Sequence, residues 1–183
     1  MKHLIWQRNS EVWEQTDPHY KRITRDYTLP NGKNKKAYLT DPGQYVVGLA
    51  VTKDYEEIIL VKEFRPGPEM LVTDLPCGAM YDNEDPCEAM LRELEEETGY
   101  TGNVELVNVT HSSPYSTQKR YTFIITDCVP TGTGQKLDPD EFIDVVKMPL
   151  KEFVRDYLIK GLTINSAAAL FAIQKLGVID YCK

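Results

Sequence analysis

The sequence predicts an α+β domain in which helices pack over a mixed β-sheet. Three observations support this prediction. Apolar segments of strand length, rich in valine and isoleucine, recur along the chain. Residues 86–98 are bounded by clear helix start and stop signals. The predicted strands and helices alternate irregularly instead of in strict βαβ units, which favours a mixed α+β sandwich.

Length, charge and cysteine usage limit the class of protein. With 183 residues, the chain suits one main domain, residues 43–183, preceded by β strands in residues 1–42. A net charge of -7 argues against a general nucleic-acid binder. No apolar run reaches the roughly 18 residues of a membrane span, and the start lacks a signal peptide. No C-x-x-C pair occurs, so we expect a cytoplasmic protein with reduced thiols at Cys77, Cys87, Cys128 and Cys182.

The elements are predicted in chain order from local signals. Asn31-Gly32 favours a tight hairpin turn between strands at 20–29 and 36–40. Val46-Val47 and the run 58–61 are apolar enough for central strands, at 45–52 and 57–64. Further strands are predicted at 105–110, 121–127 and 142–148. Helices are predicted at 150–158 and 165–176, the second with Asn165 as its N-cap.

The helix at 86–98 has the strongest boundary signals. Asp85 can cap its first turn, Pro86 suits the first helical position, and Gly99 suits the residue after its last turn. At about 100° per residue, one arc of the helix should face the core. That arc consists of Cys87, Met90, Leu91, Leu94 and Thr98.

Three carboxylates of this helix, Glu93, Glu96 and Glu97, border the predicted buried arc. Like charges repel each other unless a cation lies among them, and Mg²⁺ or Mn²⁺ takes oxygen ligands of this kind. Gly78, predicted in a loop after a strand, lets the backbone approach a ligand, and its carbonyl or that of residue 77 can add an oxygen. Arg92 stands four residues from both Glu88 and Glu96 and can fix a carboxylate.

A solvated helix face is the ordinary explanation of a glutamate-rich run, but the wider pattern argues against it. The segment reads Gly78-x5-Glu84-x7-Arg92-Glu93-x2-Glu96-Glu97-x-Gly99. A chance match to such a pattern is on the order of one in 10⁸ to 10⁹ at average residue frequencies. The segment resembles the box of the Nudix hydrolases, G-x5-E-x7-R-E-U-x-E-E-x-G-U with U aliphatic, and departs from it only at Tyr100.

This resemblance implies a Nudix-type α/β/α sandwich that hydrolyses a nucleoside diphosphate linked to another moiety, with Mg²⁺ or Mn²⁺. By the same match, Glu93, Glu96 and Glu97 would be metal ligands together with Gly78. Arg92 and Glu84 would support them, and Glu96 and Arg92 would also act in catalysis.

Flanking residues resemble the ADP-ribose and nucleoside diphosphate sugar branch of the family. The similarity lies in Leu75-Pro76-x-Gly78, in the proline of 113–116 and in 160–168. It implies substrate contacts by Arg65, Pro114 and Tyr115. A surface salt bridge of Arg65 with Glu63 or Glu69 is the alternative. The chain departs from the branch at Cys77, where alanine is usual, and at Tyr115, where glycine is frequent.

The resemblance also directs the search for a general base. Hydrolysis of a diphosphate needs an activated water, and the helix carboxylates are committed to metal. In the resembling branch, an acidic residue near the last strand serves as the base. The matching stretch is 138–144, in which Glu141 is the first candidate, followed by Asp140 and Asp138.

Three functions remain open on this basis. The leading one is cleavage of ADP-ribose or a related nucleoside diphosphate sugar into a nucleoside monophosphate and a sugar phosphate. The second is hydrolysis of another nucleotide, such as GDP-mannose, a dinucleoside polyphosphate or an oxidised nucleotide. A non-catalytic ADP-ribose-binding regulator is disfavoured by the intact box. The resemblance further implies a homodimer formed through the N-terminal strands. Aromatic residues of this region are candidates for stacking on the nucleobase: Trp6, Trp13, Tyr20 and Tyr27.

Overall fold

The computed structural model describes residues 2–17 and 20–177, and Cys182 lies outside this range. The chain forms two compact units. The first comprises Met1–Gln44 and Thr110–Arg120, and the second comprises Tyr45–Val109 and Tyr121–Lys183. In the described part of the chain, no helix is long and apolar enough to cross a membrane.

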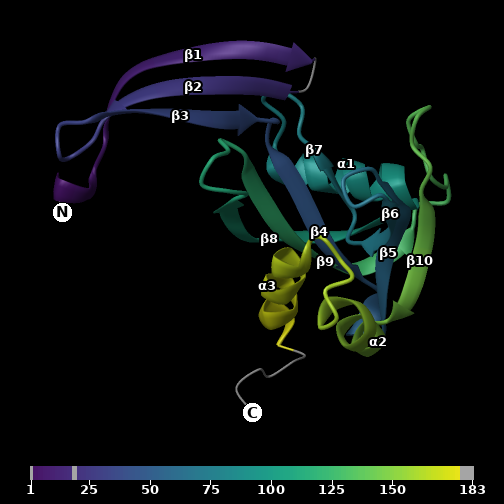
Figure 1. Cartoon of the computed structure of the whole chain (residues 1–183). Helices are drawn as coiled ribbons and strands as arrows, with labels where there is room; N and C mark the ends of the chain where they lie inside the picture. Colours follow the sequence, from purple (N-terminus) through teal and green to yellow (C-terminus); the bar gives the residue numbers. More distant parts are fainter. Residues whose placement is uncertain (1, 18–19, 178–183) are drawn as a thin grey trace. The chain divides into compact units, whose positions relative to one another are not determined.

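The first unit is built on a three-stranded antiparallel sheet, drawn in purple to blue in Figure 1. Its strands, in spatial order, are β1 (Gln7–Asp17), β2 (Tyr20–Thr28) and β3 (Asn34–Asp41). Gly32 has φ 81° in the turn between β2 and β3, which confirms the predicted hairpin. Ile23, Ala37 and Leu39 form a small buried core on this sheet, with Tyr27 packed against it.

The loop that contains Pro114 belongs to the first unit. The backbone amide of Thr40 donates to the carbonyl of Tyr115 at 3.0 Å, and the amide of Thr117 donates to the carbonyl of Thr40 at 3.0 Å. An isolated parallel bridge pairs Thr40 with Ser116. Backbone hydrogen bonds therefore fix this loop to the end of β3.

The second unit contains a seven-stranded sheet with the spatial order β10-β5-β4-β9-β8, to which β6 adds beside β5 and β7 beside β4. The strands are β4 (Tyr45–Val51), β5 (Glu57–Arg65), β6 (Met70–Asp74), β7 (Cys77–Ala79), β8 (Tyr100–His111), β9 (Lys119–Pro130) and β10 (Asp144–Pro149). The helical segments are α1 (Pro86–Thr98), α2 (Leu150–Phe153) with the following π-helical turn η3 (Val154–Leu158), and α3 (Ser166–Leu176). Short 3-10 turns occur at η1 (Lys2–Leu4) and η2 (Lys53–Tyr55).

Apolar residues of β4 alternate between the two faces of this sheet. Val46 and Ala50 pack with Met90 and other residues on the α1 face, whereas Val47 and Leu49 belong to the core on the α2 and α3 face. In Figure 1, α2 and α3 lie on one side of the sheet and α1 on the other. This arrangement confirms the predicted α+β sandwich with a mixed sheet.

Two local predictions were wrong. Gly78 lies in the short strand β7, paired with Val46 of β4, and not in a loop. Asn165 precedes α3 as predicted, but its side chain makes no capping hydrogen bond. Its Nδ2 donates instead to the Oδ2 of the buried Asp74 at 3.0 Å. A buried carboxylate requires hydrogen-bond donors, and this requirement takes priority over the cap.

Candidate carboxylate site

Helix α1 has the predicted boundaries for the predicted local reasons. The Oδ1 of Asp85 accepts hydrogen bonds from the backbone amides of Cys87 at 2.8 Å and Glu88 at 3.3 Å. Gly99, with φ 72°, ends the helix and donates its amide to the carbonyl of Glu95 at 2.8 Å. The buried residues Met90 and Leu94 hold the helix on the sheet, and in this orientation Glu93, Glu96 and Glu97 lie on one side, whereas Glu95 forms an ion pair with Lys136.

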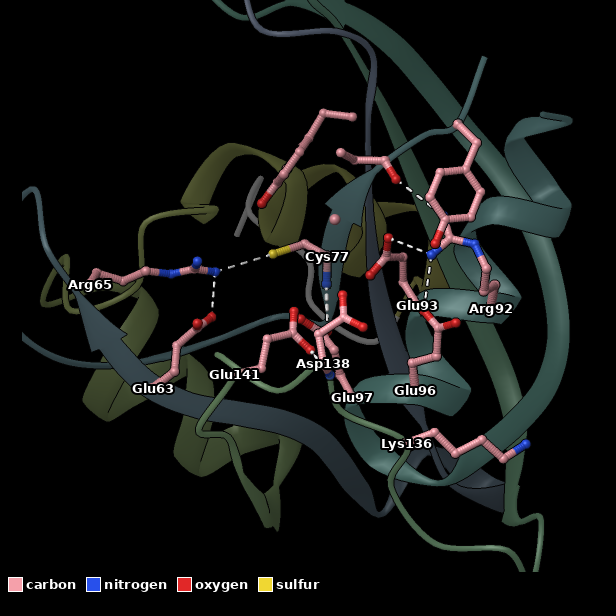
Figure 2. A pocket seen from close by; sticks show the side chains of 14 residues that line it. Glu63, Arg65, Cys77, Arg92, Glu93, Glu96, Glu97, Lys136, Asp138 and Glu141 are labelled. Carbon is pink, nitrogen blue, oxygen red and sulfur yellow. Dashed lines mark hydrogen bonds and ion pairs between the residues drawn. The ribbon is translucent and has the colours of Figure 1, made fainter. Parts of the chain in front are cut away.

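A pocket of about 300 Å³ lies beside this helix in the second unit (Figure 2). Strands β4, β5 and β7, helix α1 and the segment before β10 all contribute to its wall. The predicted residues that line it are Arg65, Gly78, Arg92, Glu93, Glu96, Glu97, Asp138 and Glu141. Cys77, whose carbonyl was the alternative to that of Gly78, also lines the pocket. The lining residues that sequence reasoning assigned no role in the site are Tyr45, Glu63, Ala79, Tyr81 and Lys136.

The guanidinium of Arg92 joins the carboxylates on one side of this pocket. It donates to both oxygens of Glu84 at 2.7 and 3.0 Å, and to Glu93 and Glu96 at 2.9 Å each. It also donates to the carbonyl of Ala79 in β7 at 3.1 Å. Of its two predicted helical partners, the structure shows Glu96 as a partner. The hydrogen bonds from Arg92 lower the pKa of Glu84 and keep its carboxylate ionised.

Burial shifts the pKa of two carboxylates of α1, Glu93 and Glu97. Glu97 is 4% exposed, and its Oε2 accepts a hydrogen bond from the backbone amide of Cys77 at 2.9 Å. Burial raises the pKa of Glu97 well above its ordinary value. Burial also raises the pKa of Glu93 to about 7, against the opposing effect of Arg92. Clustered carboxylates with raised pKa values form a site where a cation would be strongly favoured.

Gly78 is required by the close approach of β7 to Glu93. A Cβ atom at residue 78 would lie 2.2 Å from a carboxylate oxygen of Glu93. The atoms of this pocket that could bind a metal are carboxylate and backbone carbonyl oxygens. Mg²⁺ and Mn²⁺ prefer such ligands, so the residues fit either ion. In the arrangement present across residues 2–17 and 20–177, no three His, Cys, Asp or Glu side chains converge as a complete metal site. Glu93 and Glu96 are hydrogen-bonded to Arg92 instead.

The candidate base lies in the segment before β10. Glu141 and Asp138 line the pocket, and Figure 2 shows both to the left of Glu93 and Glu96 of α1. The backbone amide of Asp138 donates to Oε2 of Glu141 at 3.0 Å, and the amide of Glu141 donates to the carbonyl of Asp138 at 3.0 Å. Asp140, the second candidate, is not among the residues that line the pocket.

Arg65 ends β5 at the opposite side of the pocket (Figure 2). Its Nη2 lies 2.5 Å from Oε1 of Glu63 and 3.7 Å from Sγ of Cys77. The ion pair with Glu63, which was the alternative to a substrate contact, is therefore present, and Arg65 also lines the pocket, whereas its contact with substrate stays a prediction. Glu63 could have been found from the two-residue period of a strand, because residues 63 and 65 share a face.

Pro114 and Tyr115 belong to the first unit, where the amide of Tyr115 donates to Oγ of Ser113 at 3.1 Å. Their contact with substrate stays a prediction.

Fold and site together define a class. An α/β/α sandwich carries, on one helix and the adjoining strand, the complete arginine–glutamate pattern of a diphosphate hydrolase. The NUDIX domain model matches residues 42–167, and the chain therefore belongs to the Nudix family. The chain is 36% identical over 155 residues to an ADP-ribose pyrophosphatase of Bacillus subtilis, and the alignment covers 82% of this chain and 81% of that protein.

Other relatives extend the comparison. A methanol dehydrogenase activator of Bacillus methanolicus is 30% identical over 161 residues, with 86% of this chain and 85% of that protein covered. The crystal structure of an ADP compounds hydrolase superposes with a TM-score of 0.77 at 20% identity and covers 93% of both chains. At that identity the superposition establishes the fold. The predicted family, fold class and pyrophosphatase activity agree with these comparisons.

Proposed function

We propose that the protein hydrolyses the diphosphate of ADP-ribose or a related nucleoside diphosphate sugar, releasing a nucleoside monophosphate and a sugar phosphate. One observation carries the proposal: the Arg92-bound carboxylates of α1, the side chain of Arg65 and the carboxylate of Glu141 line a single pocket. The similarity to the Bacillus subtilis ADP-ribose pyrophosphatase supports the substrate class.

The carboxylates Glu93, Glu96 and Glu97, with the carbonyl of Gly78, would hold Mg²⁺ or Mn²⁺. When bound, such an ion neutralises phosphate charge and makes a water more acidic. Arg92 and Glu84 act as supports, because their hydrogen bonds fix the side chains of Glu93 and Glu96 before any ligand arrives.

Glu141 is assigned as the general base. A water oxygen attacks one phosphorus of the diphosphate, the bond from that phosphorus to the bridging oxygen breaks, and Glu141 accepts the proton of the water. Arg65 binds the non-bridging phosphate oxygens through its planar guanidinium, for which Glu63 is the resident partner.

Replacing Glu141 tests this assignment. We expect E141Q to lower kcat by about 10²–10⁴-fold, the usual effect of losing a general base, with a smaller change in KM. D140N is the matched control, because Asp140 does not line the pocket, and its kcat should stay within a few-fold of the wild type. Nucleoside monophosphate release would be measured with ADP-ribose, GDP-mannose and a dinucleoside polyphosphate, each with Mg²⁺ and with Mn²⁺.

Two outcomes would contradict the proposal. An E141Q enzyme within a few-fold of the wild-type kcat removes Glu141 as the base. Tight binding of ADP-ribose without turnover of any substrate in the panel favours the regulator instead.

We also propose a homodimer formed through the first unit. Successive residues of β1 point to opposite faces, so Val12, which is 63% exposed, and Trp13, which is 48% exposed, leave an apolar side chain on each face that a second copy of the chain could cover. Sedimentation velocity at micromolar concentration should give twice the mass of the chain, and a monomer would overturn this part of the proposal. We propose a cytoplasmic location as well. Cys77, Cys87 and Cys128 are free thiols, which supports this location.

A further inference from the structure

The C-terminal end of α1 is completed by the segment that follows β9. The last carbonyls of an α-helix have no partner within the helix. The carbonyl of Glu96 accepts the backbone amide of Lys136 at 2.9 Å, and the carbonyl of Glu97 accepts Nε2 of Gln135 at 2.6 Å. A segment distant in sequence therefore supplies donors to the two residues that carry predicted metal ligands.

The side chain of Gln135 makes a second hydrogen bond. Its Nε2 also donates to the carbonyl of Ile143 at 3.0 Å, which is possible because an amide nitrogen carries two hydrogens. Ile143 is buried and lies directly before β10. Gln135 thus joins the end of α1 to the start of β10, and it closes the loop of residues 137–142, in which Glu141 lies.

Glu97 connects this contact to the rest of the site. Its carbonyl accepts the Gln135 amide, whereas its carboxylate accepts the backbone amide of Cys77 in β7. One residue therefore links the loop of Glu141, the carboxylate helix and the glycine-bearing strand. Gln135 itself is not among the residues that line the pocket, so it can act only through others.

We propose that Gln135 is a positioning residue that holds the loop of Glu141 in place over the carboxylates of α1. The proposal rests on the role proposed above for Glu141. A glutamine that merely completed a helix end would stabilise the fold and leave catalysis unchanged, and kinetics can separate these two roles.

The test is a double-mutant cycle with Glu141. Q135L removes both donors at similar size, and we expect kcat to fall about 10-fold with KM within about two-fold, because misplaced groups slow the chemical step. In an E141Q background, Q135L should change kcat by less than about two-fold, since the carboxylate that it positions is already absent. Q135M, with nearly the same side-chain length, provides the same comparison should Q135L fold poorly.

T131V is the matched control. Oγ1 of Thr131 donates to the carbonyl of Gly99 at 3.0 Å, at the other end of the same connection. Its loss should lower the melting temperature somewhat less than Q135L, because one hydrogen bond to a carbonyl is lost instead of two, while kcat stays within about two-fold. If Q135L leaves kcat unchanged, or lowers it equally with and without E141Q, the positioning role is overturned. If E141Q alone retains wild-type kcat, the general-base assignment fails and the role of Gln135 falls with it.

Discussion

The close contact between Gly78 and Glu93 leads to a sharp prediction for G78A. The new Cβ would stand 2.2 Å from the nearer carboxylate oxygen of Glu93, where ordinary contact begins at 3.4 Å. The carboxylate must therefore move by about 1 Å, and a displacement of that size typically lowers the rate about 10²-fold.

The free energy of unfolding should change little in the same variant. The clash involves the far end of a flexible side chain, which can turn away without moving the backbone. Arg92 would lose its 2.9 Å hydrogen bond to Glu93 but keep its bonds to Glu84 and Glu96. We expect a stability loss below about 1 kcal/mol, the range of a single partly exposed ion pair.

Steady-state kinetics at increasing Mg²⁺, together with urea unfolding, would measure both effects. G67A is the control, because a Cβ at Gly67 meets no atom within 4 Å. We expect G78A to lose about 10²-fold in kcat/KM and to need more Mg²⁺ for half-maximal activity. Wild-type kinetics in G78A, at wild-type metal concentration, would refute the role given to this contact.

Three further predictions follow from individual side chains. Burial raises the pKa of Glu93 to about 7 from 4.5, so the folded metal-free protein holds this proton more tightly than the unfolded chain. Glu93 should therefore lower the free energy of unfolding by up to about 3 kcal/mol as pH rises from 4.5 to 7, and thermal melts of E93Q in chelator should show a shallower slope, with the part due to the raised pKa of Glu97 remaining. R92K should lower kcat/KM at least about 10-fold in initial-rate assays, because an ammonium group cannot span three carboxylates. R155K, which changes an exposed ion pair, is the control and should have wild-type activity. Equal activities of R92K and R155K would contradict this prediction. D74N should lower the free energy of unfolding in urea by about 2 kcal/mol, because the new amide group would face the donors of Asn165 and Thr163 with a donor of its own. D127N, at an exposed position, is the control. A D74N protein as stable as the wild type would show that the buried network tolerates an amide.

The bounds of the carboxylate helix could be predicted because their signals are local, whereas the predicted buried arc was partly wrong: Ala89 and Glu97 are buried and Leu91 is half-buried. The cap at Asp85, the proline after it and the glycine at residue 99 act within one turn of the helix ends, and the structure keeps all three. Strand β7 could not be predicted, because three residues that include glycine carry no strand pattern, and the pairing of Gly78 with Val46 is a tertiary contact. Gln135 gave no signal either, since a side-chain amide bound to distant carbonyls leaves no periodicity in the sequence.

The arrangement of charges explains why an arginine stands directly before Glu93. Glu93 and Glu96 would repel each other at this spacing, and both would be partly desolvated by the pocket. Arg92 offsets that repulsion. The same guanidinium also donates hydrogen bonds to the carbonyl of Ala79 in β7 and to Glu84, which lies just before α1. The positions of these carboxylates are therefore set by the protein itself, and a bound cation would meet ligands that are already gathered.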